Sequence, residues 1–167
     1  MIVRGLLGAA ATLALVLVGA CAGNPVGREC DLGTTPPNPG EIVVASPSLD
    51  CVTRTCLGVP VTNTMPPKGF VILPPTTGLC TAECESSDDC DRVPESPCVS
   101  GFTCAIPTGL TAGPYCCKKL CVCKDYIVIP SNGKIPLPDA CVPTNASNEC
   151  CNLAGRIDNP MYPLCKS

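Results

Sequence analysis

Residues 80–123 read CTAECESSDDCDRVPESPCVSGFTCAIPTGLTAGPYCCKKLCVC, and nine of these 44 residues are cysteine. The full chain of 167 residues has 17 cysteines and 20 prolines, but no tryptophan, two phenylalanines and three tyrosines. Aromatic side chains supply the largest apolar area per residue, so little material is available for a hydrophobic core. Disulfides typically contribute about 2–4 kcal/mol each. We therefore expect cross-links, more than a core, to hold this fold.

The chain after the N-terminal segment is predicted to form short strands joined by long loops. Runs of β-branched or aromatic residues occur at residues 41–44, 70–73, 126–129 and 101–104, and such runs are typical of short strands. Proline and glycine interrupt every helical period after residue 20. The expected fold class is a small, disulfide-rich β and loop structure, with short strands and little helix outside the N-terminal segment.

The N-terminal segment has the parts of an export signal. Arg4 gives it a positive start, residues 6–18 are predominantly apolar, and two small residues precede Cys21. A retained membrane span is disfavoured, because residues 5–20 fall short of the roughly 20 apolar residues that cross a bilayer. The segment therefore predicts export of the chain.

The order Val18-Gly19-Ala20-Cys21 resembles the lipobox of bacterial lipoproteins. The resemblance implies cleavage before Cys21, lipidation of its thiol, and a mature chain that is anchored to the membrane without spanning it. In that family a residue other than aspartate after the lipidated cysteine directs sorting to the outer membrane, and Ala22 fits this rule. Secretion as a soluble protein is the alternative, because Ala20-Cys21-Ala22 also has the small-x-small pattern of an ordinary export signal.

Removal or modification of Cys21 leaves sixteen cysteines, an even number. Cysteines in the oxidising compartments outside the cytosol are mostly paired. The members of the adjacent pairs 116–117 and 150–151 should bond different distant partners, because neighbouring Cα atoms are about 3.8 Å apart and a disulfide usually needs about 4.4–6.8 Å. The pairing scheme stays open. The expected disulfide residues are Cys30, Cys51, Cys56, Cys80, Cys84, Cys90, Cys98, Cys104, Cys116, Cys117, Cys121, Cys123, Cys141, Cys150, Cys151 and Cys165.

Changes in composition divide the chain into four parts. Residues 1–20 are the predicted signal peptide, residues 21–40 are a Pro/Gly-rich tether that lifts the domain off the membrane, and residues 41–123 are the disulfide-rich domain. Residues 124–167 hold four cysteines. They are either a looser C-terminal extension or a continuation of the same domain.

The chain contains no histidine, and this removes several catalytic mechanisms. A Ser-His-Asp triad, a Cys-His dyad and a histidine metal site are all impossible. Carboxylate pairs remain as a general acid and base for glycoside hydrolysis, but the chain has no tryptophan and few other aromatic residues to stack on a sugar ring. We therefore expect no enzyme activity, no catalytic residue and no cofactor.

The charged residues indicate solvated surfaces. The formal net charge is −3, and one small basic cluster is formed by Lys118, Lys119 and Lys124. Since nucleic-acid binding needs many clustered cations, we expect no nucleic-acid partner. Residues 83–95 carry six acids and one base, Arg92, but their spacing matches no calcium loop, so we expect a solvated acidic loop and no metal.

The spacing Cys116-Cys117-x3-Cys121-x-Cys123 has a second interpretation as a thiolate cluster for zinc or copper. An oxidising compartment favours disulfides at the same residues. The sequence thus predicts cross-links here, with a metal-binding protein as an alternative.

Two family resemblances concern the cysteine-rich region. Residues 80–90, 101–104 and 113–117 resemble modules in cysteine-rich envelope lipoproteins of myxobacteria and related bacteria, a resemblance that implies a location and no activity. Cys84-x5-Cys90 and Cys116-Cys117-x3-Cys121 are similar to the four-disulfide-core (whey acidic protein) family of small protease inhibitors. The chain departs from that family in the 25 residues between Cys90 and Cys116, where the family has a short spacer. The second resemblance implies an inhibitory loop, for which residues 106–114 are the candidate.

The sequence as a whole predicts a lipid-anchored, disulfide-stapled protein of the cell envelope, at the outer membrane, acting as a non-catalytic surface or binding module. Its expected partner is the membrane, through the N-terminal lipid, and the sequence identifies no protein or surface ligand. A secreted small protease inhibitor is one alternative. A thiolate metal-binding protein is another.

Overall fold

The computed structural model describes residues 24–111, 113–142, 150–151, 153–163 and 165–166. Short strands and two 3-10 turns are its regular elements, and none of the helices in these ranges is long and apolar enough to cross a bilayer. The expected fold class, disulfide-rich β and loop structure, is confirmed. The elements are β1 (Asn24–Val26), β2 (Glu29–Asp31), β3 (Val43–Ala45), β4 (Thr55–Gly58), β5 (Thr77–Thr81), η1 (Ser87–Asp89), β6 (Cys90–Arg92), β7 (Phe102–Ala105), β8 (Leu120–Cys123) and η2 (Asp139–Cys141).

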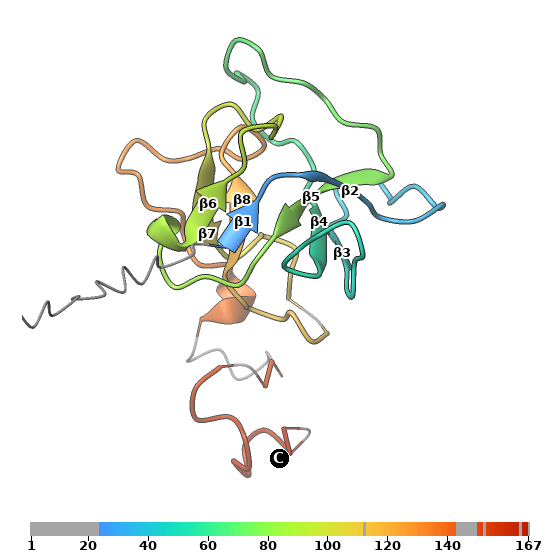
Figure 1. Ribbon diagram of the computed structural model, residues 1–167. Coiled ribbons are helices and arrows are strands. Elements are labelled where there is room, and N and C mark those ends of the chain that lie inside the picture. Colours follow the sequence, from blue (N-terminus) through green and yellow to red (C-terminus); the bar gives the residue numbers. More distant parts are fainter. Residues whose placement is uncertain (1–23, 112, 143–149, 152, 164, 167) are drawn as a thin grey trace, which may run out of the picture.

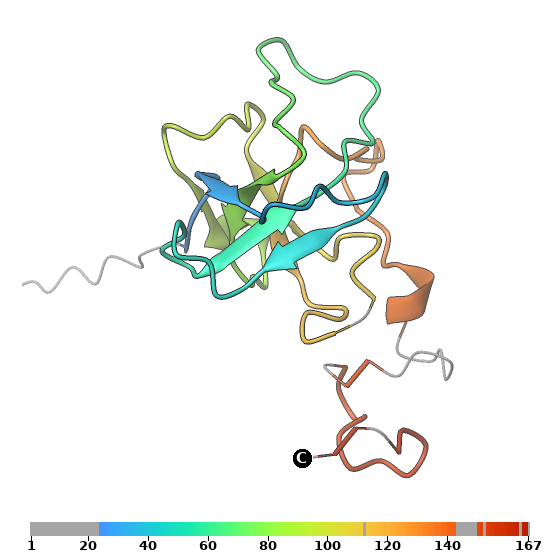
Figure 2. The same ribbon diagram turned by 90° about the vertical axis from the view of Figure 1, so that its right-hand side faces the viewer.

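The strands form three small sheets (Figures 1 and 2). An antiparallel sheet has the order β2-β5-β4-β3, and β7 and β8 form an antiparallel pair. The N-terminal strand β1 pairs with β6 in parallel. Beyond β8 the chain continues through η2 to a C-terminal segment, drawn in red below the body of the molecule in both views.

The interpretation of residues 24–31 as part of a tether is wrong. These residues form β1 and β2, which pair with β6 and β5. The side chain of Val26 is fully buried, and Cys30 is bonded to Cys56. The local richness in proline and glycine predicted a free path, but strand partners far along the chain supply the hydrogen bonds and burial that order this segment. Cys21 lies outside the described residues.

Two of the four strand predictions are confirmed and two are wrong. β3 and β7 overlap the predicted runs at residues 41–44 and 101–104, whereas residues 70–73 and 126–129 form loops and turns. Ile72 is 74% exposed and Val128 is 62% exposed, so these runs lack the half-buried, paired setting that a strand requires. Six of the eight strands contain a cysteine. In this chain the segments that form strands are therefore mostly those that also carry a cross-link.

The Cys30–Cys56 disulfide passes over β5 at a glycine. Cys30 lies in β2 and Cys56 in β4, and these strands flank β5 on opposite sides. Two strand spacings in a flat sheet would be roughly 9–10 Å, but the Cα atoms of the two cysteines are 5.9 Å apart. The sheet therefore curls around Gly78, which is the register partner of Cys30. A Cβ atom at Gly78 would lie 2.7 Å from the Leu57 carbonyl oxygen and 3.0 Å from Cys56 Sγ.

Cysteines that face each other across a strand pair bond to other segments. Cys56 is the register partner of Cys80, but their bonds go to Cys30 and Cys51. In the same way Cys104 and Cys121 face each other across β7 and β8. Their bonds are Cys84–Cys104 and Cys90–Cys121. Each pair of strands is thereby tied to two further parts of the chain.

A small core fills the space between the sheets. Val26, Leu79 and Phe102 come from β1, β5 and β7 and are buried in one cluster. The buried Thr81 hydroxyl donates to the Cys121 carbonyl at 2.8 Å, which joins β5 directly to β8. The core is therefore shared by all three sheets, although its apolar side chains are few.

Substitution of Gly78 by alanine tests the curl of the sheet. The added methyl group meets backbone and a disulfide sulfur, and overpacking of this kind typically costs about 1–3 kcal/mol. We expect the G78A variant to unfold at a lower temperature, measured by circular dichroism, and to show mispaired Cys30 or Cys56 in a non-reducing peptide map. Gly109→Ala is the control, because its Cβ would meet only the flexible Ile42 side chain. Equal thermal midpoints for the two variants would contradict the role of Gly78.

Candidate functional site

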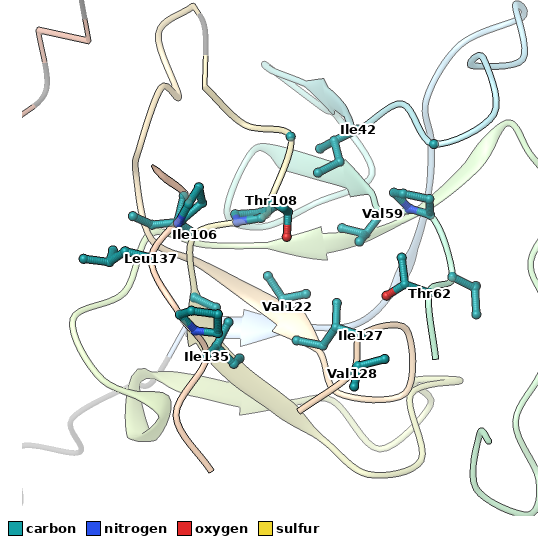
Figure 3. A pocket seen from close by; sticks show the side chains of 18 of the residues that line it. Ile42, Val59, Thr62, Ile106, Thr108, Val122, Ile127, Val128, Ile135 and Leu137 are labelled. Carbon is teal, nitrogen blue, oxygen red and sulfur yellow. The ribbon is translucent and has the colours of Figure 1, made fainter. Parts of the chain in front are cut away.

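An apolar cleft of about 870 Å³ is the candidate functional site (Figure 3). Its walls come from separate stretches of the chain: the loop before β3, the residues that follow β4, the loop after β7, and the segment between β8 and η2. The principal apolar side chains that line it are Ile42, Val59, Val61, Ile106, Val122, Ile127, Val128, Ile135 and Leu137. Figure 3 shows Ile42, Val59, Val122 and Ile127 around one space, although they belong to different segments.

The lining of the cleft is aliphatic and nearly uncharged. Val122 of β8 is buried at its floor, whereas Val128 and Leu137 are exposed. The Thr62 hydroxyl already donates to the Tyr126 carbonyl at 3.2 Å. Among the described lining residues, Asp139 carries the one formal charge. The cleft is therefore suited to hydrocarbon and offers little to hold a charged or sugar-like ligand.

A second, smaller cleft of about 340 Å³ shares residues 59–61 with the first. Tyr126 lines it and packs edge-on against Phe70, with ring centroids 5.8 Å apart. Burial, with smaller effects from the charges of Asp125 and Glu29, raises the pKa of Tyr126 to about 12. The raised pKa therefore reflects how deeply this side chain is buried beside the second cleft.

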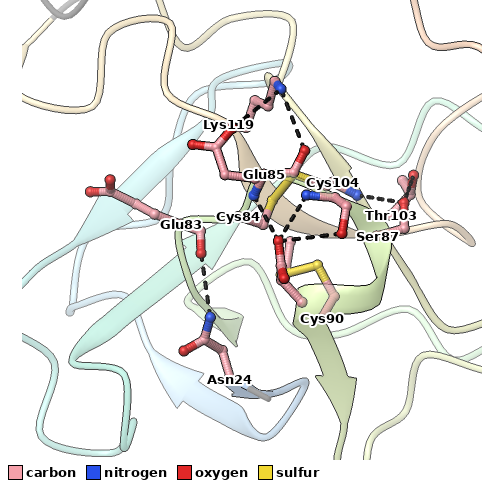
Figure 4. The surroundings of a disulfide bond; sticks show 12 residues. Asn24, Glu83, Cys84, Glu85, Ser87, Cys90, Thr103, Cys104 and Lys119 are labelled. Carbon is pink, nitrogen blue, oxygen red and sulfur yellow. Dashed lines mark hydrogen bonds and ion pairs between the residues drawn. A yellow bond between two sulfur atoms is a disulfide. The ribbon is translucent and has the colours of Figure 1, made fainter. Parts of the chain in front are cut away.

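The predicted acidic loop and the predicted basic cluster meet in space. The Lys118 ammonium donates to the Glu83 carboxylate, and Lys119 Nζ lies 3.9 Å from a carboxylate oxygen of Glu85. Figure 4 shows Glu85 and Lys119 next to the Cys84–Cys104 disulfide. Two of the predicted acids and two of the predicted bases are therefore partners in ion pairs.

The Asp89 carboxylate orders the first part of the acidic loop. It accepts hydrogen bonds from the backbone N–H groups of Glu85 and Ser86, each at 2.8 Å. The Ser86 and Glu85 amides hold the pKa of the Asp89 carboxyl below the ordinary aspartate value of 3.8. This carboxylate therefore has a structural role, because it accepts backbone hydrogen bonds within its own loop.

Three of the four cysteines whose spacing suggested a thiolate cluster form disulfides. Cys117 is bonded to Cys141, Cys121 to Cys90 and Cys123 to Cys98. A sulfur in a disulfide is not a thiolate, so three of the four proposed metal ligands are committed elsewhere. Cys117 is bonded to Cys141, and Cys151 is bonded to Cys165. No S–S bond therefore joins the two neighbours in either adjacent pair, 116–117 or 150–151.

The candidate inhibitory loop serves as a wall of the cleft. Ile106 and Leu110, its large aliphatic side chains, are both buried. The Leu110 amide donates to Pro107, and the Cys117 amide donates to the Leu110 carbonyl. The loop thus turns these side chains inward, whereas an inhibitor must present a side chain to its protease.

Sequence reasoning did not identify the residues of the cleft. Residues 126–129 were interpreted as a strand, and residues 135–139 as part of an undefined extension, yet both line the site. The signal available in the sequence was the occurrence of aliphatic residues next to prolines, as in residues 127–130 and 135–138. The region that resembles envelope lipoproteins forms β6 to β8 and their loops. No family model, curated protein or solved structure matches the chain, so the two family resemblances remain predictions.

Removal of the Asp89 carboxylate should loosen the loop before η1. In the D89A variant we expect several-fold faster hydrogen exchange at the amides of Glu85 and Ser86. Because the folded pKa of Asp89 is lowered, its contribution is present above pH 3.8 and is lost as the pH falls through the folded value. At such low pH, the exchange rates of these two amides in the wild-type protein should approach those in D89A. Asp88→Ala, in the same 3-10 turn, is the control, and equal exchange in both variants would contradict the assignment.

Proposed function

We propose that this protein is a lipid-anchored binding module of the cell envelope, without catalysis, whose apolar cleft holds a neutral aliphatic chain such as the hydrocarbon tail of a lipid. The observation that carries the proposal is the lining of the cleft. Aliphatic side chains and prolines from four separate segments surround one space, with a single formal charge among the described lining residues.

The size of the cleft supports a small ligand. Ligand clefts usually have volumes of about 300–1,000 Å³, and this one has about 870 Å³. An anionic head group close to Asp139 would be repelled, which favours a neutral ligand. Each buried methylene group contributes about 0.8 kcal/mol, so affinity should rise with chain length until the cleft is filled.

The lining also favours an aliphatic ligand over an aromatic one. The described lining residues include no aromatic side chain that could stack on a ring. The proline and isoleucine side chains of the lining offer apolar surface to a ligand and no hydrogen-bond donor or acceptor. Two cross-links lie next to the cleft and fix two of its walls: Cys84–Cys104 at β7 and Cys117–Cys141 at η2. A preformed cleft loses less conformational entropy on binding.

Anchoring in the envelope is supported by the sequence around Cys21. The apolar run, the small residues before the cysteine and the even number of later cysteines all fit a lipidated N-terminus. Two or three acyl chains give stable attachment where one would be marginal. Ala22 supports the outer membrane as the location.

Substitution of Cys21 tests the anchor. We expect the natively expressed protein to sediment with membranes and to have an intact mass that begins at Cys21 and includes acyl chains. Cys21→Ser should abolish the added mass and the lipid-dependent partitioning, because serine offers no thiol for the diacylglycerol. A wild-type protein found soluble, with a mass that begins after Ala22, would contradict the anchor and leave the cleft proposal standing.

A charge placed at the mouth of the cleft tests the ligand. In a calorimetric titration, 1-decanol should bind the C21S chain saturably and more tightly than decanoate. Val128→Asp should weaken 1-decanol binding by about tenfold or more, because the new carboxylate is desolvated by the alkyl chain. Val52→Asp is the matched control, since Val52 is 77% exposed and lies outside the cleft.

The two variants separate binding from folding. Both substituted side chains are exposed, so the circular dichroism spectrum and the disulfide map should match those of the starting protein. Equal affinity of V128D and V52D for 1-decanol would refute the cleft as the binding site. Preference for decanoate over 1-decanol would refute the neutral ligand.

A further inference from the structure

The seven S–S bonds of the structure involve fourteen of the sixteen cysteines between residues 30 and 165. The remaining two, Cys116 and Cys150, lie beside one another next to the Cys117–Cys141 bond. The Sγ atoms of Cys116, Cys117 and Cys150 all lie within 4.8 Å of one another. Cys150 Sγ also donates a hydrogen bond to the Cys116 carbonyl at 2.8 Å.

We propose that Cys116 and Cys150 form an eighth disulfide, which covalently links the C-terminal segment beyond η2 to the body of the protein. The bond would lie beside Cys117–Cys141, so that the adjacent cysteines 116 and 117 each hold a different residue of the chain beyond β8. This assignment follows from proximity and from the position of both side chains in one buried cluster with Ile106.

The geometry allows the bond with small movements. An S–S bond is about 2.05 Å long, so the two sulfurs must approach from a separation within 4.8 Å. A change between staggered χ1 rotamers at either cysteine moves its sulfur by a comparable distance. Both residues are only 4% exposed, so the two sulfurs lie close together in a closed space.

The surroundings of Cys150 keep it in place. The guanidinium of Arg156 is buried, lies 4.5 Å from the centre of the Tyr162 ring, and donates to the Cys150 carbonyl at 3.4 Å. The Cys151–Cys165 bond closes the same segment into a ring. These contacts of the described residues hold Cys150 beside Cys116.

Formation of the bond is a two-electron oxidation. The two thiols lose two protons and two electrons, and a protein or small-molecule disulfide in the export compartment accepts them and becomes a dithiol. Burial, together with Cys150, raises the pKa of Cys116 to about 12. Because the thiolate is the reactive form, the bond should form early, while the C-terminal segment is still open, and should exchange slowly after it has closed.

Thiol counting in the full-length C21S chain tests the proposal. The substitution removes the thiol of Cys21, and the chain is exported to an oxidising compartment and treated with oxidised glutathione. After denaturation without reductant, we expect no alkylation of cysteine and a mass lower than that of the reduced chain by sixteen hydrogens, two for each of eight bonds. Two alkylated cysteines and a deficit of fourteen hydrogens would overturn the proposal.

Serine variants identify the partners. Cys116→Ser should expose one thiol, at Cys150, and Cys150→Ser should expose one thiol, at Cys116. The double variant should expose neither and should retain the other seven bonds in a non-reducing peptide map. A single variant that exposes a thiol at any other position would refute the pairing. These readouts do not depend on ligand binding or on lipidation.

Discussion

Disulfides that leave each strand pair in different directions hold the three small sheets of this protein together. Cys56 and Cys80 face each other, as do Cys104 and Cys121, but all four bond to a third segment. A bond between facing neighbours would only repeat what the strand hydrogen bonds already do. The outward bonds instead tie each strand pair to a further strand or loop, which suits a chain that is poor in aromatic residues.

The fold class and two strands could be predicted from the sequence because both depend on local composition. The other strands depend on partners far away: β1 pairs with β6, and β2 pairs with β5. Sixteen cysteines permit on the order of two million pairings, so the cross-links that select these partners could not be deduced. The apolar run at residues 70–73 had the right composition but pairs with no strand in the described part of the chain.

The candidate site was hidden for a related reason. Ile42, Val59, Ile106 and Ile135 lie far apart in the sequence and form one surface only after the chain has been cross-linked. Each residue by itself indicates a strand or a core position. The absence of histidine from the sequence was informative at once, because it concerns the inventory of side chains and not their arrangement. Chemistry that depends on inventory can be predicted earlier than binding that depends on shape.

The position of β1 limits how the proposed anchor would hold the protein. Strand pairing begins at Asn24, three residues after Cys21, and three extended residues reach about 10 Å at most. With a lipid on Cys21, the folded body would stand directly on the bilayer, with almost no clearance and little freedom to tumble. A partner that binds at β1 would then have to approach within about 10 Å of the membrane surface.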